Sequence, residues 1–210
     1  MTFKAIETME TPTLLLRPLE AGDAAALFEQ MLGDAETVRD LAFERHATAL
    51  TTHEYITQAL VGWKYGSMFR YVLVCKDTGA LTAIIELTPR LPQIELGLVI
   101  SRKGGTRRRR DGIIAFRAFL DWLIGQPGVY RVFACCAVDG LAHSSMERLG
   151  FKQEGRLVNY EARPNRGLVA ADSYLYALTR PVTPVKSLHA EKNTVGAEPS
   201  IAGAVAVEEY

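Results

Sequence analysis

Short stretches of alternating or continuous apolar residues predict strands along most of the chain, and stretches with helical spacing predict the helices between them. The predicted strands are residues 13–17, 70–76, 81–87, 94–100, 130–137, 153–161 and 173–179. The predicted helices are one that Asp23 caps, two pieces within 35–65 with Thr51 or Thr52 as a cap, 113–124, and 141–149, which Gly150 ends. The nearly continuous apolar run at 130–137 indicates a buried central strand.

Composition limits the classes of protein to which the chain can belong. It has 210 residues, of which 48% are hydrophobic, enough for one globular domain, which we expect over residues 1–181. Residues 182–210 lack helical or strand periodicity and predict a flexible tail. The 24 basic and 24 acidic side chains balance, which argues against a duplex-binding protein. No apolar run approaches the roughly 20 residues of a membrane span.

The three cysteines, Cys75, Cys135 and Cys136, show no metal-ligand spacing, and their odd number does not suit a set of disulfides. We expect reduced thiols, a cytoplasmic location and no bound metal. Because adjacent residues of a strand face opposite sides, at most one of Cys135 and Cys136 can reach a cleft. A thiol that carries the acyl group is one interpretation of this residue, and core packing is the preferred one.

A run of glycine and arginine at residues 104–112 directly precedes the predicted helix 113–124. Glycine lets successive backbone N–H groups converge, the start of a helix carries positive partial charge, and arginine pairs with phosphate oxygens. The run therefore predicts a site for a compact anion, with a phosphorylated ligand as the first interpretation. A solvated basic turn and a nucleic-acid patch are the alternatives, and the balanced net charge disfavours the second.

Three strings in the chain resemble the motifs of a known family. They are Leu-Leu-Leu-Arg-Pro-Leu at 14–19, Ile-Glu-Leu-Gly at 94–97, and Glu-Arg-Leu-Gly-Phe at 147–151. Over roughly residues 13–180 the chain resembles the GNAT acyltransferase superfamily, most closely its RimJ/RimL-like branch, whose members modify amines, often protein N-termini. The resemblance implies an α+β fold, a three-layer α/β arrangement in which helices flank a central mixed, mostly antiparallel sheet.

The resemblance also implies acetyl-CoA as the acyl donor and co-substrate. Its pyrophosphate would be held by the loop and the helix start, for which the candidate residues are Arg107, Arg108, Arg109, Arg110, Asp111, Gly112 and Ile113. Asp139 is the candidate contact for the pantetheine arm and His143 the candidate contact for a phosphate. The chain departs from the family's loop pattern at Ile114, where a small residue is usual, and the loop is longer than usual.

Transfer to an amine implies direct attack on the thioester in a ternary complex. Strand N–H groups at Val99 and Ile100 are the candidates for stabilising the carbonyl oxygen. Glu95 is the candidate base because it interrupts an apolar strand, and a salt bridge or a solvent-facing position is the alternative. Met146 occupies a position where some branches have a tyrosine acid, so the proton for the departing thiolate must come from elsewhere. Ser144 is the candidate acid or relay, with helix capping as its alternative.

The acceptor is expected to be a primary amine on a small molecule, a peptide or a protein. The candidate walls of its site come from the first helices, one strand and the closing hairpin: Tyr65, Glu86 (also the second candidate base), Asn159, Tyr160, Glu161 and Arg163. Two further interpretations stay open, a catalytically weak module that binds CoA or a partner, and a transferase for a longer acyl group. We expect no membrane or nucleic-acid partner, and a homodimer is compatible with a small enzyme.

Overall fold

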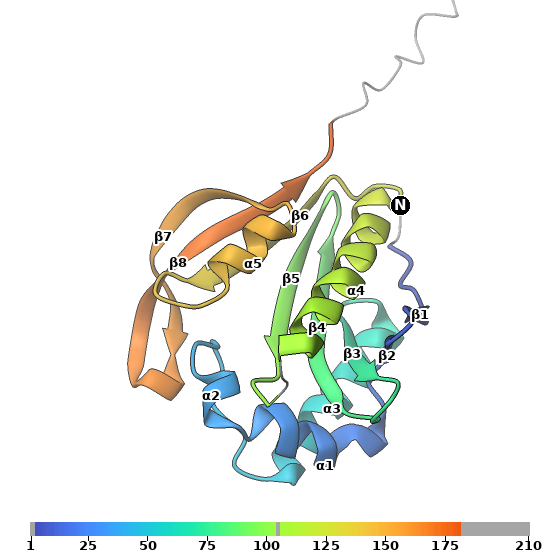
Figure 1. The fold of residues 1–210 in the computed structure, drawn as a ribbon. Coiled ribbons are helices and arrows are strands. Elements are labelled where there is room, and N and C mark those ends of the chain that lie inside the picture. The colour runs from blue at the N-terminus through green and yellow to red at the C-terminus, as the bar shows by residue number, and fades with distance from the viewer. Residues whose placement is uncertain (1–2, 104–105, 182–210) are drawn as a thin grey trace, which may run out of the picture.

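One mixed sheet organises the protein. The computed structural model describes residues 3–103 and 106–181, with the side chains of 106–109 also left out, so the predicted tail lies outside the described residues. Eight strands follow the order β1-β2-β3-β4-β5-β6-β8-β7, and every neighbouring pair is antiparallel except β5 and β6, which are parallel (Figure 1). The predicted α+β class with a mixed, mostly antiparallel sheet is confirmed.

Each predicted strand is present, and a short N-terminal strand is added. The strands are β1 (Met9–Glu10), β2 (Leu14–Pro18), β3 (Phe69–Cys75), β4 (Leu81–Arg90), β5 (Gln93–Ile100), β6 (Arg131–Ala137), β7 (Lys152–Arg163) and β8 (Leu168–Thr179). The last hairpin is longer than predicted, because the polar segment after Arg163 forms only the short turn η3 (Pro164–Arg166) before β8 starts. Gly167 closes that turn with a positive φ of 69°, which glycine adopts without strain.

Helices cover both faces of the sheet. They are α1 (Ala24–Leu27), α2 (Ala35–Val38), α3 (Ala49–Tyr65), α4 (Thr106–Gly125) and α5 (His143–Arg148), with the short turns η1 (Ala21–Asp23) and η2 (Phe28–Leu32) beside α1. Residues of α4 and α5 share one buried cluster, and residues of α1, η2 and α3 share a second (Figure 1). In the part of the chain that the structure describes, no helix has the length and apolarity to cross a membrane.

The two buried clusters hold the helices in place. On one face, Phe119 of α4 packs edge-on against Tyr71 of β3, with 5.5 Å between ring centroids. Leu123, one turn further along α4, is fully buried. On the other face, Ile56 of α3 packs in the same cluster as Ile84 of β4. Because side chains alternate between faces along each strand, a residue's position in its strand decides which helices it meets.

Two predicted caps are wrong. The cap of α3 is Thr48, whose hydroxyl accepts the Thr51 N–H at 3.3 Å, whereas Thr52 is buried and its hydroxyl lies 2.8 Å from His46 Nδ1. Asp23 lies at the third position of η1, and its carboxylate accepts the N–H of the preceding Glu20 at 2.9 Å instead of capping the next helix. Both errors have one cause, since a helix start is set by backbone geometry that several nearby polar residues could satisfy.

The start of α4 was also predicted too late. The helix begins at Thr106 and not at Ile113, so the backbone of the arginine run forms its first turns and not a loop. Arginine has a good helix propensity, and Gly112 is tolerated inside a helix at a cost of about 1 kcal/mol. The predicted anion cradle therefore becomes a helix N-terminus.

Candidate active site

The sheet is open between its two parallel strands. β5 and β6 are paired only from Gln93 with Arg131 to Glu95 with Phe133. Beyond those residues β5 continues beside β4, while β6 continues beside β8, so the strands separate toward their C-terminal ends (Figure 1). We call this opening the β5–β6 gap. It exposes strand N–H and C=O groups that have no partner strand.

The alternation of peptide groups along β5 decides which of them face the gap. The N–H of Ser101, directly after β5, donates to the Thr82 carbonyl at 2.9 Å, so this residue directs its peptide groups at β4. The β4–β5 register runs without a bulge, so Val99 is directed at β4 as well, and Leu98 and Ile100 are directed at the gap. The N–H of Val99 is therefore used in the sheet, contrary to the prediction, and that of Leu98 takes its place beside Ile100.

The N-terminus of α4 follows β5 and supplies positive partial charge. The first-turn N–H groups, at residues 106–109, have no acceptor within the helix. The side chains of Arg107, Arg108 and Arg109 lie outside the described residues, so their predicted contacts stay predictions. Residues 111–113 lie past the first turn, where N–H groups bond within the helix, and they are not the free donors that were expected.

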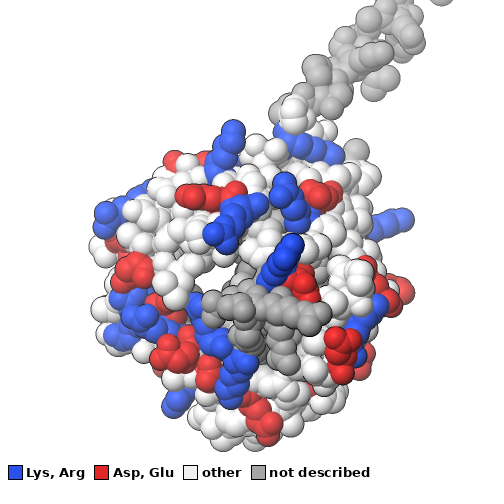
Figure 2. Space-filling model, viewed as in Figure 1, with Lys and Arg blue, Asp and Glu red and all other residues white. Residues whose placement is uncertain are grey.

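Open space and positive charge accompany this helix start. A Cβ added at Gly112 would meet no heavy atom within 4 Å, so the flank of the second turn is open. Arg102 and Arg110 are exposed, and neither forms an ion pair with any described residue. Figure 2 shows Lys and Arg side chains around a hollow on this face. The surroundings thus suit an extended ligand with phosphate groups.

Two carboxylates of the α3 face differ in their availability. Glu86 is ion-paired with the buried Arg70, whose guanidinium also donates to the Tyr55 carbonyl at 3.1 Å and lies 3.9 Å from that ring. Glu95 is half-buried at the last position where β5 still pairs with β6, directly before the gap. Its carboxylate has no hydrogen bond or ion pair with any described residue. Glu86 is held in a structural pair, and Glu95 is the carboxylate that a substrate can use.

A thiol lies on β6 just beyond the point where β5 and β6 separate. Cys135 follows Phe133 by two residues on β6 and so shares the face of Glu95. Tyr160 of β7 lies within electrostatic reach of Cys135, and the charge of an ionised Cys135 raises the pKa of Tyr160. Burial raises the pKa of Cys135, which keeps it a neutral thiol at neutral pH and disfavours a nucleophilic role.

Arg163, at the end of β7, is a buried side chain that contacts β7 and β8. Although predicted as a wall of the acceptor site, its side chain is only 2% exposed. Its guanidinium pairs with Glu161 at 2.7 Å and donates to Ser173 Oγ at 2.8 Å. Asn159, another predicted wall, has a positive φ of 51° and donates its N–H to Asp172 at 2.9 Å. These contacts lie on β7 on both sides of Tyr160, where the pairing of β7 with β8 is irregular.

The tip of the β7–β8 hairpin is tied to the end of α2 and to the segment that connects α2 with α3. The side-chain amide of Asn165 donates to the carbonyls of Val38 and Phe43, each at 2.8 Å. Its oxygen accepts the Arg45 N–H at 2.8 Å. Three hydrogen bonds from one side chain join segments more than 100 residues apart, with separations of 120 to 127 along the chain. We call this contact the hairpin clasp.

Arg166 extends the clasp to the loop after β6. Its guanidinium binds Asp139 at 2.5 and 2.7 Å and approaches Asp40 at 3.4 Å. The hydrogen bonds from Arg166 lower the pKa of Asp139 to about 2, so the predicted pantetheine contact is a carboxylate already held by an arginine. The hairpin thereby bridges the first helices and the loop that precedes α5.

The side chains of α5 divide between packing and exposure. His143 Nε2 lies 3.0 Å from the Val138 carbonyl, and its Nδ1 lies 3.3 Å from the Tyr176 hydroxyl, so the ring has protein partners and is not free for a phosphate. Ser144 is exposed. Met146 is buried in the core of the α4 face and offers no proton.

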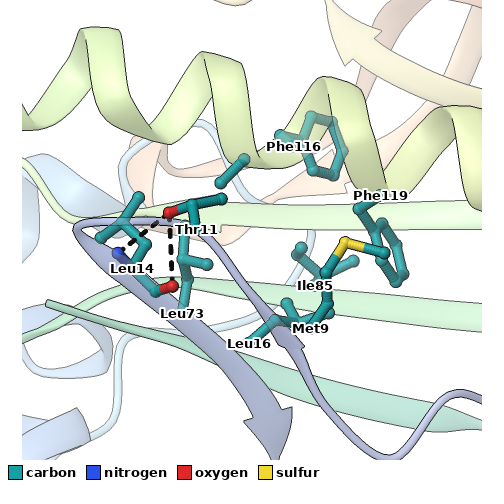
Figure 3. Close-up of a pocket in the computed structure, with 9 residues that line it drawn as sticks. Met9, Thr11, Leu14, Leu16, Leu73, Ile85, Phe116 and Phe119 are labelled. Carbon is teal, nitrogen blue, oxygen red and sulfur yellow. Dashed lines mark hydrogen bonds between the residues drawn. The ribbon is translucent and has the colours of Figure 1, made fainter. Parts of the chain in front are cut away.

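Two further places do not join the site. Tyr65 ends α3 with 73% of its surface exposed, and Lys64 is its only ring contact among the described residues. A cavity of about 10 Å³ lies between α4 and the sheet, lined by apolar side chains such as Phe116, Phe119 and Ile85 (Figure 3). That volume is about one water molecule, so the cavity is a packing defect and not a ligand site.

Comparison with known proteins agrees with this geometry. The family model described as Acetyltransferase (GNAT) domain matches residues 13–152, and no curated protein matches the chain. A ribosomal-protein-S5-alanine acetyltransferase from Vibrio fischeri superposes with a TM-score of 0.67 at 18% identity, over 82% of this chain and 96% of that one.

Two further solved structures are similar. RimL, a ribosomal L7/L12 alpha-N-protein acetyltransferase in complex with coenzyme A, has a TM-score of 0.70 at 17% identity, covering 82% and 98% of the two chains. An acetyltransferase from Salmonella typhimurium that modifies the N-terminal serine of L7/L12 has a TM-score of 0.68 at 16% identity, covering 83% and 100%. With its family model matched over two thirds of its length, and with a sheet that opens between β5 and β6, the chain belongs to the GNAT acetyltransferase family.

Proposed function

We propose that this acetyltransferase modifies the N-terminal amine of a protein or peptide, with acetyl-CoA as the donor and direct attack of the amine in a ternary complex. The observation that carries the proposal is the Glu95 carboxylate, which lies where β5 and β6 begin to separate and has no partner among the described residues. A carboxylate there can attract an ammonium group and then take a proton from the attacking nitrogen. The N–H groups of Leu98 and Ile100 are directed to the place where the thioester oxygen would gain charge.

The chemistry of the acceptor favours an N-terminus over a lysine. An N-terminal amine has a reference pKa of about 7.7–8.0 and a lysine amine about 10.4. One carboxylate is therefore enough to deprotonate an N-terminal amine near neutral pH, whereas a lysine amine holds its proton more strongly. The hairpin clasp at Asn165 holds the tip of the β7–β8 hairpin against the end of α2 and the segment after it. RimL and the Salmonella typhimurium enzyme act on N-termini of ribosomal proteins, and their folds are similar to this one.

The described residues also fit CoA as the donor. The N–H groups at the start of α4 and the exposed Arg102 and Arg110 suit its phosphates, while the open flank at Gly112 leaves room for the rest of the molecule. The thioester supplies an activated acetyl group with a good leaving thiol. The protein's own contribution is then to align the amine and carbonyl and to handle the protons.

The proposal is tested with a panel of paired peptides. Each pair has one sequence with a lysine, once with a free N-terminus and a blocked lysine, and once with a blocked N-terminus and a free lysine. We expect thiol release from acetyl-CoA and a mass gain of one acetyl group with the free N-terminus only. Acetylation of the lysine form at an equal rate contradicts the N-terminal preference, and small amines included in the panel reveal a small-molecule acceptor.

Gly112→Ala separates cofactor contact from helix stability. Alanine in a helix interior is favoured over glycine by about 0.5–1 kcal/mol, so the variant should unfold at a slightly higher temperature. If the cofactor lies against Gly112, the added methyl group should weaken CoA binding severalfold in calorimetry. Gly125→Ala is the matched control, because its Cβ also meets no heavy atom within 4 Å and it lies at the far end of α4. Unchanged CoA affinity in Gly112→Ala places the cofactor elsewhere.

A further inference from the structure

The helices on the Glu95 face of the sheet cover only part of it. Their buried cluster takes its strand residues from β3, β4 and β5, such as Val72, Ile84 and Val99. In the part of the chain that the structure describes, no residue of β6, β7 or β8 belongs to this cluster. The packing of α1 and α3 on this face therefore ends at β5, beside the β5–β6 gap.

Apolar side chains continue on the same face beyond β5. Phe133 of β6 pairs with Glu95 in the parallel register, so their side chains project from the same face of the sheet. Cys135 lies two residues further along β6, and Leu175 of β8 pairs with it. All three are half-buried, and none belongs to either buried cluster. We call Phe133, Cys135 and Leu175 the apolar strip.

A carboxylate borders the apolar strip. Neighbouring strands lie about 4.8 Å apart, so the backbones of Glu95 and Phe133 are this close where they pair. The Arg131 guanidinium lies 5.7 Å from the centre of the Phe133 ring, and Glu154 neutralises its charge through two hydrogen bonds. The carboxylate of Glu95 has no such partner among the described residues. Negative charge beside an apolar surface fits an ammonium group that carries an apolar substituent.

We propose that the apolar strip binds the first side chain of the acceptor, so that the enzyme selects protein or peptide N-termini with a bulky apolar first residue. In an N-terminal residue the side chain and the amine are attached to the same α-carbon. An amine that meets Glu95 therefore brings its first side chain next to that carboxylate, where Phe133 is the nearest member of the strip. Leu175, one strand further, extends the contact for longer side chains. The assignment rests on the proposed function and names the substrate class of that site.

Burial of apolar surface supplies the selectivity. A leucine or phenylalanine side chain of the acceptor covers the half-buried ring of Phe133 and excludes water from it, whereas alanine or serine leaves the ring exposed. One methylene group in an enclosed apolar pocket changes kcat/KM by about 10-fold or more, and an open surface gives less for each group. The three additional carbons of leucine over alanine should then give about 10-fold in all.

The test compares kcat/KM with acetyl-CoA for peptides that differ only in the first residue, which is alanine, serine, leucine or phenylalanine. In the unaltered protein we expect leucine and phenylalanine to exceed alanine and serine by about 10-fold. In Phe133→Ala this ratio should fall to about 1 because leucine and phenylalanine react more slowly, while CoA affinity in calorimetry stays within about twofold. A merely structural role of Phe133 would slow all four peptides equally and keep the ratio, which overturns the proposal. Equal rates for the four peptides in the unaltered protein overturn it too.

Two further variants complete the experiment. Tyr65→Ala removes a ring that is 73% exposed at the end of α3, outside the apolar strip, and should keep the ratio. Leu175→Ala shortens the strip at its far end and should slow phenylalanine more than alanine, so the proposal stays testable if Phe133→Ala does not fold. Acetylation of N-termini without regard to the first residue contradicts this preference alone, whereas acetylation of lysine only contradicts the proposed function as well.

Discussion

Glu95→Gln is expected to lower kcat by about 100-fold near pH 7, the usual contribution of a general base. The amide keeps the size and polarity of the side chain but cannot accept a proton. The loss should be largest at low pH, where the acceptor amine is mostly protonated, and should shrink as the pH rises above the amine pKa of about 8. A pH series of initial rates from about 6 to 9.5, with thiol release as the readout, measures this dependence.

The matched control for Glu95 is Glu154→Gln. Glu154 is a carboxylate of β7 that pairs with Arg131 at 2.5 Å away from the gap, so its loss should leave the rate profile unchanged. Equal rates for Glu95→Gln and the unaltered protein at every pH would remove Glu95 from the mechanism. A constant loss at all pH values would instead assign it to binding of the acceptor.

Arg163→Met is expected to lower the free energy of unfolding by about 3 kcal/mol, because it leaves Glu161 with a partly buried charge and no counterion. For a domain of this size the melting temperature should fall by roughly 6–12 °C. The unpaired Arg163 Nε has no acceptor among the described atoms, so methionine leaves no additional partner there unsatisfied. Thermal unfolding followed by circular dichroism gives the shift.

Arg156→Met tests whether burial is the cause. Arg156 lies on the same strand and pairs with Asp172 at 2.6 Å, but its side chain is 57% exposed. Exposed ion pairs contribute about 0–1 kcal/mol, so this variant should unfold within a few degrees of the unaltered protein. Similar losses in both variants would show that the buried position of Arg163 has no special effect.

The strands were predictable because each has a local pattern, and the open pair was not. Alternation of apolar residues predicted both β5 and β6, but their separation after Glu95 depends on which other strand each of them follows. The same dependence on neighbouring strands explains why Val99 was predicted to direct its N–H at the gap, whereas Leu98 does so in the structure. Which of two adjacent N–H groups faces the gap depends on the register between β4 and β5. That register is known only from the structure, in which the Ser101 N–H donates to the Thr82 carbonyl.

The sequence also could not show which candidate carboxylates are already paired, because their partners lie far away along the chain. Glu86 and Glu95 look alike as single carboxylates in apolar strands, and only the pairing of β3 with β4 shows that Arg70 occupies the first. Asp139 was expected to meet the cofactor, and Arg166 holds it from the hairpin. A signal was present for Arg70, since an arginine inside an apolar strand must find a buried acid.

The hairpin clasp has a consequence for how this enzyme can change. The family model matches residues 13–152, which contain Glu95, the open strands and the start of α4, whereas Tyr160 and Asn165 come afterwards. The residues proposed to act on the donor and the hairpin that carries Asn165 and Arg166 therefore lie in successive parts of the chain, and those two side chains join the hairpin to the first helices. Exchange of the hairpin between relatives should retarget the enzyme to new amines while leaving its use of the donor intact.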